Sequence, residues 1–185
     1  MINVNDLRSG MTFLYEKEIF LVLEANHSKS GRGQAHVKAK VRNLNTGTIK
    51  TITFTGGDIV YPAIIETRKA QYLYRDNQDF IFMDEETFDQ IIIPEKTLIW
   101  EKNFLLEGES IKLKVYEEKV IGIELKASVI LTVTYTEPGV KGNSATNTTK
   151  PATLETGYTV QVPLFINNND KIIINTIDGT YKSRA

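Results

Sequence analysis

The residues best suited to chemistry in this chain lie in one short segment, Lys29-Ser30-Gly31-Arg32-Gly33-Gln34-Ala35, where two glycines bracket a single arginine. A guanidinium stays charged and offers a planar fork of N–H donors to phosphate oxygens. The flanking glycines add no bulk, so the arginine side chain can enter a narrow space. The segment therefore predicts a loop tip that presents one cation to an anionic partner.

Positive groups gather around this tip, while residues 25–57 contain no Asp or Glu. The cationic and imidazole side chains in that range are His27, Lys29, Arg32, His36, Lys38, Lys40, Arg42 and Lys50. Such groups can neutralise several phosphates and release their counterions. Nucleic acid is the partner that this pattern predicts, with contacts from His27, His36, Lys38, Lys40 and Arg42. A solvated hairpin with ordinary surface cations is the alternative interpretation.

The elements that must position these residues are strands. Strict alternation over residues 35–42 places Val37, Ala39 and Val41 on one face and the cations on the other. A strand over 18–24 precedes the tip, and a turn near Asn45 leads into a partner strand over 48–55. We expect a small antiparallel barrel with a protruding hairpin whose six-residue arms carry the tip roughly 20 Å outward.

Strand-like runs continue through the rest of the chain. We expect strands over residues 71–74, 79–83, 87–93, 110–116, 119–125, 129–135, 158–166 and 171–175. Pro94 is expected to open a short helix, and Asp178-Gly179 to form a turn before the last residues. Five strands with one short helix favour an OB-type barrel, and the last third repeats the pattern. Between its strands, residues 137–150 form a long polar loop of the kind that is usually functional or disordered.

We predict three domains, at residues 1–64, 65–128 and 129–185. The first carries 8 Lys and Arg against 5 Asp and Glu, the second 9 against 14, and the third 5 against 4. This distribution fits a molecule that touches RNA at its ends and turns an acidic middle toward solvent or a basic protein. Chance variation among three small domains is the alternative.

Composition excludes several classes of protein. The 185 residues include no cysteine, which excludes disulfides, thiol nucleophiles and cysteine-bound metals. The first residues lack the basic and apolar regions of a signal peptide, and no apolar run approaches the length of a membrane span. We expect a cytoplasmic protein without membrane contact.

Enzymatic chemistry has little support in the sequence. His27 and His36 lie on opposite hairpin arms with no third ligand nearby, so no metal site is predicted. Asp84-Glu85-Glu86 fits a charged turn better than a catalytic pair, and common nucleotide-binding, hydrolase and zinc-protease motifs are absent. The aromatic residues Tyr72, Tyr74, Phe80, Phe82 and Phe88 fit a core better than a base-stacking platform. Tyr181 and Arg184 end the chain outside any apolar period and could stack on a base and hold a phosphate.

Longer motifs are distributed over the whole chain. They are Lys29 to Ala35, Gln71-Tyr72-Leu73-Tyr74, Phe82-Met83-Asp84, Tyr135-Thr136-Glu137-Pro138-Gly139-Val140-Lys141-Gly142, Lys150-Pro151-Ala152 and Gly179-Thr180-Tyr181-Lys182-Ser183-Arg184. Together these motifs resemble bacterial translation elongation factor P, which is related to the hypusine-containing translation factor of eukaryotes and archaea.

The resemblance implies a KOW/SH3-like barrel followed by two OB-folds in an elongated, bent, tRNA-like arrangement. It implies a monomeric elongation factor that binds both ribosomal subunits between the peptidyl (P) and exit (E) sites. There the factor would stabilise the peptidyl-tRNA, promote peptide bond formation and relieve stalling at consecutive prolines.

The resemblance also implies roles for particular residues. Arg32 would reach the CCA end of the peptidyl-tRNA, and its neighbours Lys29, Ser30, Gly31, Gly33 and Gln34 would form the tip loop. The loop Gly142, Asn143, Ser144, Ala145 and Thr146 would face the small subunit and the exit-site codon. Tyr181 and Arg184 would contact the peptidyl-tRNA.

The tip departs from the common patterns of the family. Many relatives carry a modified lysine there, which Arg32 excludes, and arginine-tipped relatives are often rhamnosylated but usually have asparagine next, where this chain has Gly33. Ser30 replaces a common proline. Two states therefore stay open, an Arg32 rhamnosylated by a modifying enzyme and an unmodified Arg32. No other cofactor is expected. A stand-alone OB-fold protein that binds single-stranded RNA without a ribosomal role is the alternative function.

Overall fold

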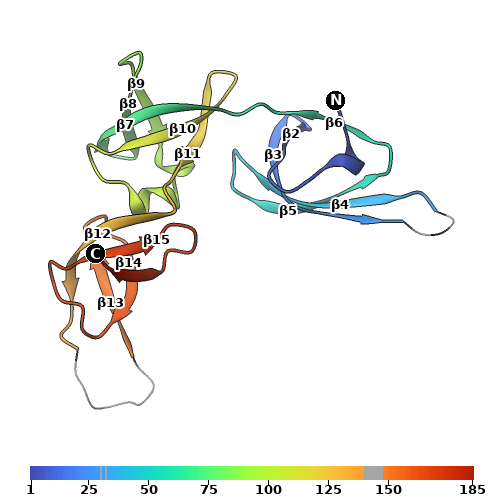
Figure 1. The fold of residues 1–185 in the computed structure, drawn as a ribbon. Helices are drawn as coiled ribbons and strands as arrows, with labels where there is room; N and C mark the ends of the chain where they lie inside the picture. Colours follow the sequence, from blue (N-terminus) through green and yellow to red (C-terminus); the bar gives the residue numbers. More distant parts are fainter. Residues whose placement is uncertain (30, 32, 140–147) are drawn as a thin grey trace. The chain divides into compact units, whose positions relative to one another are not determined.

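The structure, a computed structural model, describes residues 1–29, 31, 33–139 and 148–185. The described chain contains three antiparallel sheets and three short 3-10 helices, which confirms the predicted all-β class (Figure 1). None of its helices is long and apolar enough to cross a membrane.

The first sheet has six strands in the order β1-β6-β2-β3-β4-β5. Their bounds are β1 Ile2–Asn3, β2 Thr12–Tyr15, β3 Glu18–Ser28, β4 His36–Asn43, β5 Ile49–Thr55 and β6 Ile59–Pro62, with the 3-10 helix η1 at Val4–Asp6. Strands β3 and β4 form the long hairpin that leads to the tip (Figure 1).

The second sheet has the order β11-β10-β7-β8-β9, and the third β14-β13-β12-β15-β16. The second comprises β7 Glu66–Asp76, β8 Asp79–Asp84, β9 Gln90–Pro94, β10 Ser110–Tyr116 and β11 Lys119–Glu124, with η2 Glu95–Thr97 and η3 Glu101–Phe104. The third comprises β12 Ser128–Thr136, β13 Thr149–Leu154, β14 Thr159–Pro163, β15 Lys171–Asn175 and β16 Tyr181–Arg184.

Backbone contacts divide the chain into two compact units. One comprises Met1–Arg68 with Leu113–Gly122, and the other Lys69–Lys112 with Ile123–Ala185. The core of the first unit lies on the inner face of the first sheet, where Phe13, Phe20 and Phe54 pack with apolar residues of β4. In the same unit, Ile121 packs against Ile19 and Ala63.

Trp100 is one of the residues that link the two sheets of the second unit. Trp100 packs edge-on against Phe104 and Tyr158, and its Nε1 donates a 2.9 Å hydrogen bond to the carbonyl of Thr176. Phe104, which follows the second sheet's strands β7–β9, is buried in the core of the third sheet. Gly179 lies so close that an added Cβ would sit 2.3 Å from the Tyr158 hydroxyl. The two sheets of this unit are therefore held together by aromatic packing and a part-buried hydrogen bond.

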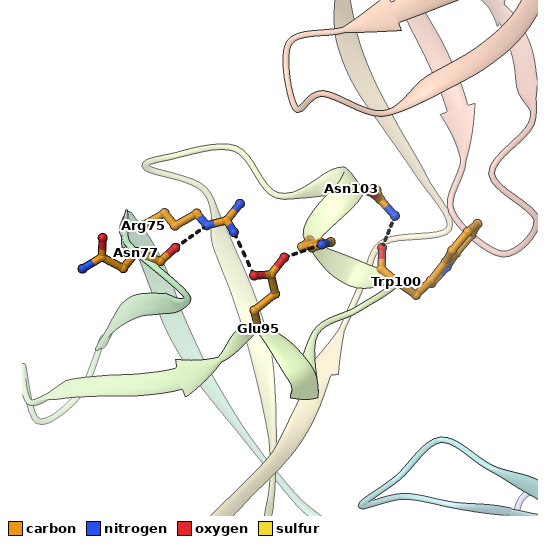
Figure 2. Close-up of polar contacts among 6 residues, drawn as sticks. Arg75, Asn77, Glu95, Trp100 and Asn103 are labelled. Carbon is orange, nitrogen blue, oxygen red and sulfur yellow. Dashed lines mark hydrogen bonds and ion pairs between the residues drawn. The ribbon is translucent and has the colours of Figure 1, made fainter.

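Three charged side chains form two ion pairs in the second sheet, near this junction. Glu95 pairs with Arg75 at 2.9 Å and with Lys102 (Figure 2). The Arg75 guanidinium also lies over the Phe80 ring. The hydrogen bond from Lys102, followed by the Arg75 charge, lowers the pKa of Glu95 despite some desolvation. Because exposed pairs are screened by solvent, they position side chains more than they stabilise the fold.

Pro94 ends β9 and is the N-cap residue of the 3-10 helix η2, which is the short helix predicted there. Other sequence predictions of local structure were wrong. The strand expected over 87–93 begins only at Gln90, because the Asp84 carboxylate accepts the N–H groups of Glu86 and Thr87 and fixes a turn. Strands β1, β2, β6, β13 and β16 were not predicted. The first three of these contain only two to four residues, too few for a periodic signal.

The junction in the second unit yields a stability prediction. Gly179 has φ +73, and its absent Cβ would also lie 2.7 Å from Trp100 Cη2. We expect Gly179→Ala to lower the free energy of unfolding by roughly 2–4 kcal/mol, through backbone strain and overpacking. Urea unfolding followed by Trp100 emission measures this. Gly108→Ala is the control, because Gly108 lies in the same unit and has φ +85, but a Cβ there meets nothing within 4 Å; equal losses in the two variants would contradict the packing argument.

Candidate nucleic-acid interface

Strand β4 separates its side chains into two faces, as its sequence predicted. Val37, Ala39 and Val41 are buried in the first core, and His36, Lys38, Lys40 and Arg42 are exposed on the opposite face. Each buried valine favours this orientation by about 1.5–3 kcal/mol. A one-residue slip would bury the cations, so the core determines which way they point. We call these four residues the cationic strip.

The residues opposite each lysine of the strip differ in charge, and this difference affects how freely the lysine can bind a phosphate. Lys38 is paired across the sheet with Asn26 and Thr53, which are both neutral. Lys40 is paired with Glu24 and Thr51. The sequence places Glu24 just outside the acid-free range, and only the strand register pairs this residue with a strip cation; its carboxylate accepts a 3.0 Å hydrogen bond from the Asn26 amide. Lys38 therefore has no acidic residue directly opposite it in either neighbouring strand, whereas Lys40 has Glu24.

The structure does not bring His27 to the strip. His27 is paired with the inward-facing Val37, so its side chain projects from the face of the hairpin that is opposite the cationic strip. Its Nε2 lies 2.8 Å from the carbonyl of Asn5 and 3.5 Å from the Arg8 guanidinium. His27 thus ties the hairpin to the η1 turn, a contact between distant segments that the local pattern could not reveal.

The root of the tip loop is defined on both sides. Ser28 and His36 form the last pair of the hairpin, and the N–H of Gly56 donates to the carbonyl of Ala35 at 2.5 Å. Lys29, Gly31, Gly33 and Gln34 are exposed. Ser30 and Arg32 lie outside the described residues, so their predicted roles stay predictions.

A second loop begins at a tightly held root in the third sheet. The loop residues Gly142, Asn143, Ser144, Ala145 and Thr146 lie outside the described residues. At its root, Lys150 is only 7% exposed and its Nζ donates to the carbonyl of Glu137. An added Cβ on Gly139 would lie 2.4 Å from the carbonyl oxygen of Leu164. The sequence showed the loop but not this anchoring, because the contacts come from segments distant in sequence.

The chain's last strand positions the two remaining candidate residues. Tyr181 pairs with Ile174 and packs against the third core, so it does not stand outside the apolar pattern as the sequence suggested. Arg184 is 56% exposed in its side chain and its Nη2 lies 3.1 Å from Asp170. A phosphate that bound Arg184 would have to compete with this carboxylate.

Other candidates from the sequence have structural roles. Tyr72, Phe80 and Phe82 form the predicted core of the second sheet, while Tyr74 and Phe88 are exposed. The described residues contain no group of three or more metal-ligating side chains.

Three family profiles match consecutive parts of the chain. The elongation factor P KOW-like domain matches residues 3–60, the elongation factor P OB domain matches 65–123, and the elongation factor P C-terminal domain matches 129–184. The chain belongs to the elongation factor P family. This confirms the predicted KOW-like and OB-type domains. Elongation factor P is a translation factor that associates with the ribosome and not an enzyme, as the sequence indicated.

Relatives span the same length. Elongation factor P of Mesomycoplasma hyopneumoniae (strain 232) is 49% identical over 185 residues, which are the whole of both chains. The archaeal structure titled eukaryotic translation initiation factor 5A from Methanococcus jannaschii is similar with a TM-score of 0.52 at 19% identity. That match covers 66% of this chain and 90% of the other, and at this identity it shows a shared fold.

The strip yields a prediction for the affinity of this protein for ribosomes. Lys38→Gln should weaken binding and reduce the slope of log affinity against log salt by about 1, the effect of losing one phosphate contact. Lys40→Gln should change the slope less, because Glu24 already opposes Lys40. In a Glu24→Gln background the two lysine variants should become equal. Equal slopes for the single variants, measured by filter binding at increasing KCl, would contradict this assignment.

Proposed function

We propose that this protein binds the ribosome between the P and E sites, stabilises the peptidyl-tRNA and relieves stalling at consecutive prolines. Family membership supports the ribosomal role. The observation that carries the finer proposal is the cationic strip on the hairpin that leads to the tip, because it can hold an RNA backbone while the tip reaches further.

The proposed mechanism is positioning. Proline is a constrained donor and a poor acceptor in peptide bond formation, so a factor that holds the peptidyl-tRNA in a reactive geometry lowers the barrier without an acid or base. The strip would neutralise backbone phosphates of the tRNA. Arg32 would then hold the CCA end through its planar fork, in a loop formed by Lys29, Ser30, Gly31, Gly33 and Gln34.

The C-terminal domain would supply the contacts far from the tip. We propose that Gly142 to Thr146 face the small subunit and the exit-site codon, a role supported by the rigid root at Lys150 and Gly139. Arg184 would contact the peptidyl-tRNA by exchanging Asp170 for a phosphate. Tyr181 is half-buried, so only the exposed part of its side chain would contact the peptidyl-tRNA. The domains at 1–64, 65–128 and 129–185 would form a bent, tRNA-like monomer in the cytoplasm.

The chemical state of Arg32 is open to direct measurement. Intact mass of the protein purified from its native host distinguishes the two states. An increment of one deoxyhexose indicates rhamnosylation by a tip-modifying enzyme, and the bare chain mass indicates that Arg32 works unmodified. A lysine-specific modification at the tip is excluded by the arginine itself.

The central prediction concerns translation of a proline run. Arg32→Ala should abolish the relief of stalling, because alanine offers no donors to the CCA end, while ribosome binding through the strip persists. Toeprinting on a template with consecutive prolines measures the stall, and co-sedimentation measures binding. Arg32→Ala that relieved the stall as well as the parent would refute the tip mechanism. A protein that bound free single-stranded RNA but did not co-sediment with ribosomes would support the stand-alone RNA-binding alternative.

A further inference from the structure

The second unit contains a cavity that is not part of the candidate nucleic-acid interface. It has a volume of about 680 Å³, which lies in the range of small-molecule sites. Its walls come from β7, from β8, from η3 and the segment that follows it, and from the turn between β13 and β14. Arg75, Lys102, Glu107, Glu155 and Tyr72 supply its charged and hydroxyl groups.

Tyr72 is the feature that points to a ligand. The residue is only 5% exposed, and its ring packs against Phe80 and Phe82 at 5.8 and 5.3 Å. Within the described part of the chain its hydroxyl has no hydrogen-bond partner. That part has no side-chain polar atom that is sealed from solvent and lacks a partner, so the Tyr72 hydroxyl keeps some contact with solvent, and Tyr72 is one of the residues that line the cavity. Such a hydroxyl can donate to a ligand without giving up a protein hydrogen bond, which makes it a candidate for ligand recognition.

The neighbouring polar groups differ, because they already have protein partners. Thr156 donates to the carbonyl of Asn103 at 2.7 Å, and the Asn103 amide donates to the carbonyl of Trp100 at 3.0 Å. Arg75 and Lys102 are both held by Glu95 (Figure 2). Burial and the nearby Glu107 carboxylate raise the pKa of Tyr72, so its hydroxyl stays protonated and can donate at neutral pH.

The charges of the cavity restrict the class of ligand. Arg75 and Lys102 share a single carboxylate, Glu95, so this wall keeps a net positive charge. Glu107 and Glu155 also line the cavity and are negative. A polyanion would meet two carboxylates and a polycation would meet two cations, so both are disfavoured. A ligand with one charge of each sign can satisfy both sets.

We propose that this cavity binds a short zwitterionic peptide, with its carboxylate toward Arg75 and Lys102, its ammonium toward Glu107 and Glu155, and a hydrogen bond from Tyr72. The volume suits two or three residues rather than a free amino acid. The site is separate from the cationic strip and requires no ribosome, so it can be tested on the protein alone.

Isothermal titration calorimetry with triglycine tests the proposal, and N-acetyl-triglycine amide is the matched probe without end charges. We expect saturable binding of triglycine and none of the blocked peptide. Tyr72→Phe removes only the hydroxyl and should weaken triglycine binding about three- to tenfold. Tyr74→Phe changes a tyrosine outside the cavity and should leave the affinity unchanged. Equal binding of the two peptides, or no binding of triglycine at millimolar concentration, would overturn the proposal.

Unfolding of the ligand-free protein gives an independent check. Because the Tyr72 hydroxyl has no protein partner, Tyr72→Phe should leave the urea midpoint unchanged or raise it. Tyr158→Phe removes a hydroxyl that donates to the carbonyl of Gly179 at 3.0 Å, and it should lower the midpoint. If Tyr72→Phe lowered the midpoint as much as Tyr158→Phe, the hydroxyl would be serving the fold, and the assignment of Tyr72 to a ligand would be wrong.

Discussion

Burial of the inner face of β4 is the constraint on which the candidate interface depends. Val37, Ala39 and Val41 have no exposure, and the aromatic residues Phe13, Phe20 and Phe54 fill the core beneath them. A strand has only two faces, so fixing the apolar side chains also fixes the direction of every cation between them. The interface therefore needs no special structure of its own. It is the outer surface of a strand that the core holds in register.

In the second unit, contacts between the second and third sheets hold the structure in place. Trp100 and Phe104, which follow β9, contact the third sheet, where the backbone of Gly179 makes room for the indole. Part-buried hydrogen bonds from Trp100 and Thr156 to backbone carbonyls add direction to this packing. A polar cavity lies beside the junction, lined in part by the turn after β13 and by β7. A factor that works by positioning needs this kind of rigidity, because a loosely held contact would not orient a large substrate.

The roots of the two proposed contact loops are held more firmly than their sequences suggest. Both loops are rich in glycine and small polar residues, which indicates freedom. Yet a backbone hydrogen bond from Gly56 anchors one root, and a buried lysine together with a glycine without space for a side chain anchors the other. Gly56 and Leu164 lie well beyond the loops whose roots they contact, so the local composition predicts the loops but not how their roots are held.

The sequence alone determined the all-β class, the hairpin, the two faces of β4 and the family, because strand period, turn residues and motifs are local properties. It did not reveal the shortest strands or β16, since two to four residues carry no period. Only the tertiary structure placed Glu24 opposite Lys40, turned His27 toward Asn5 and gave Arg184 its carboxylate partner. It alone brought Tyr72 to the wall of a cavity. The physical reason is common to all four, because each depends on which distant segments the packing of the core brings within a few ångströms of one another.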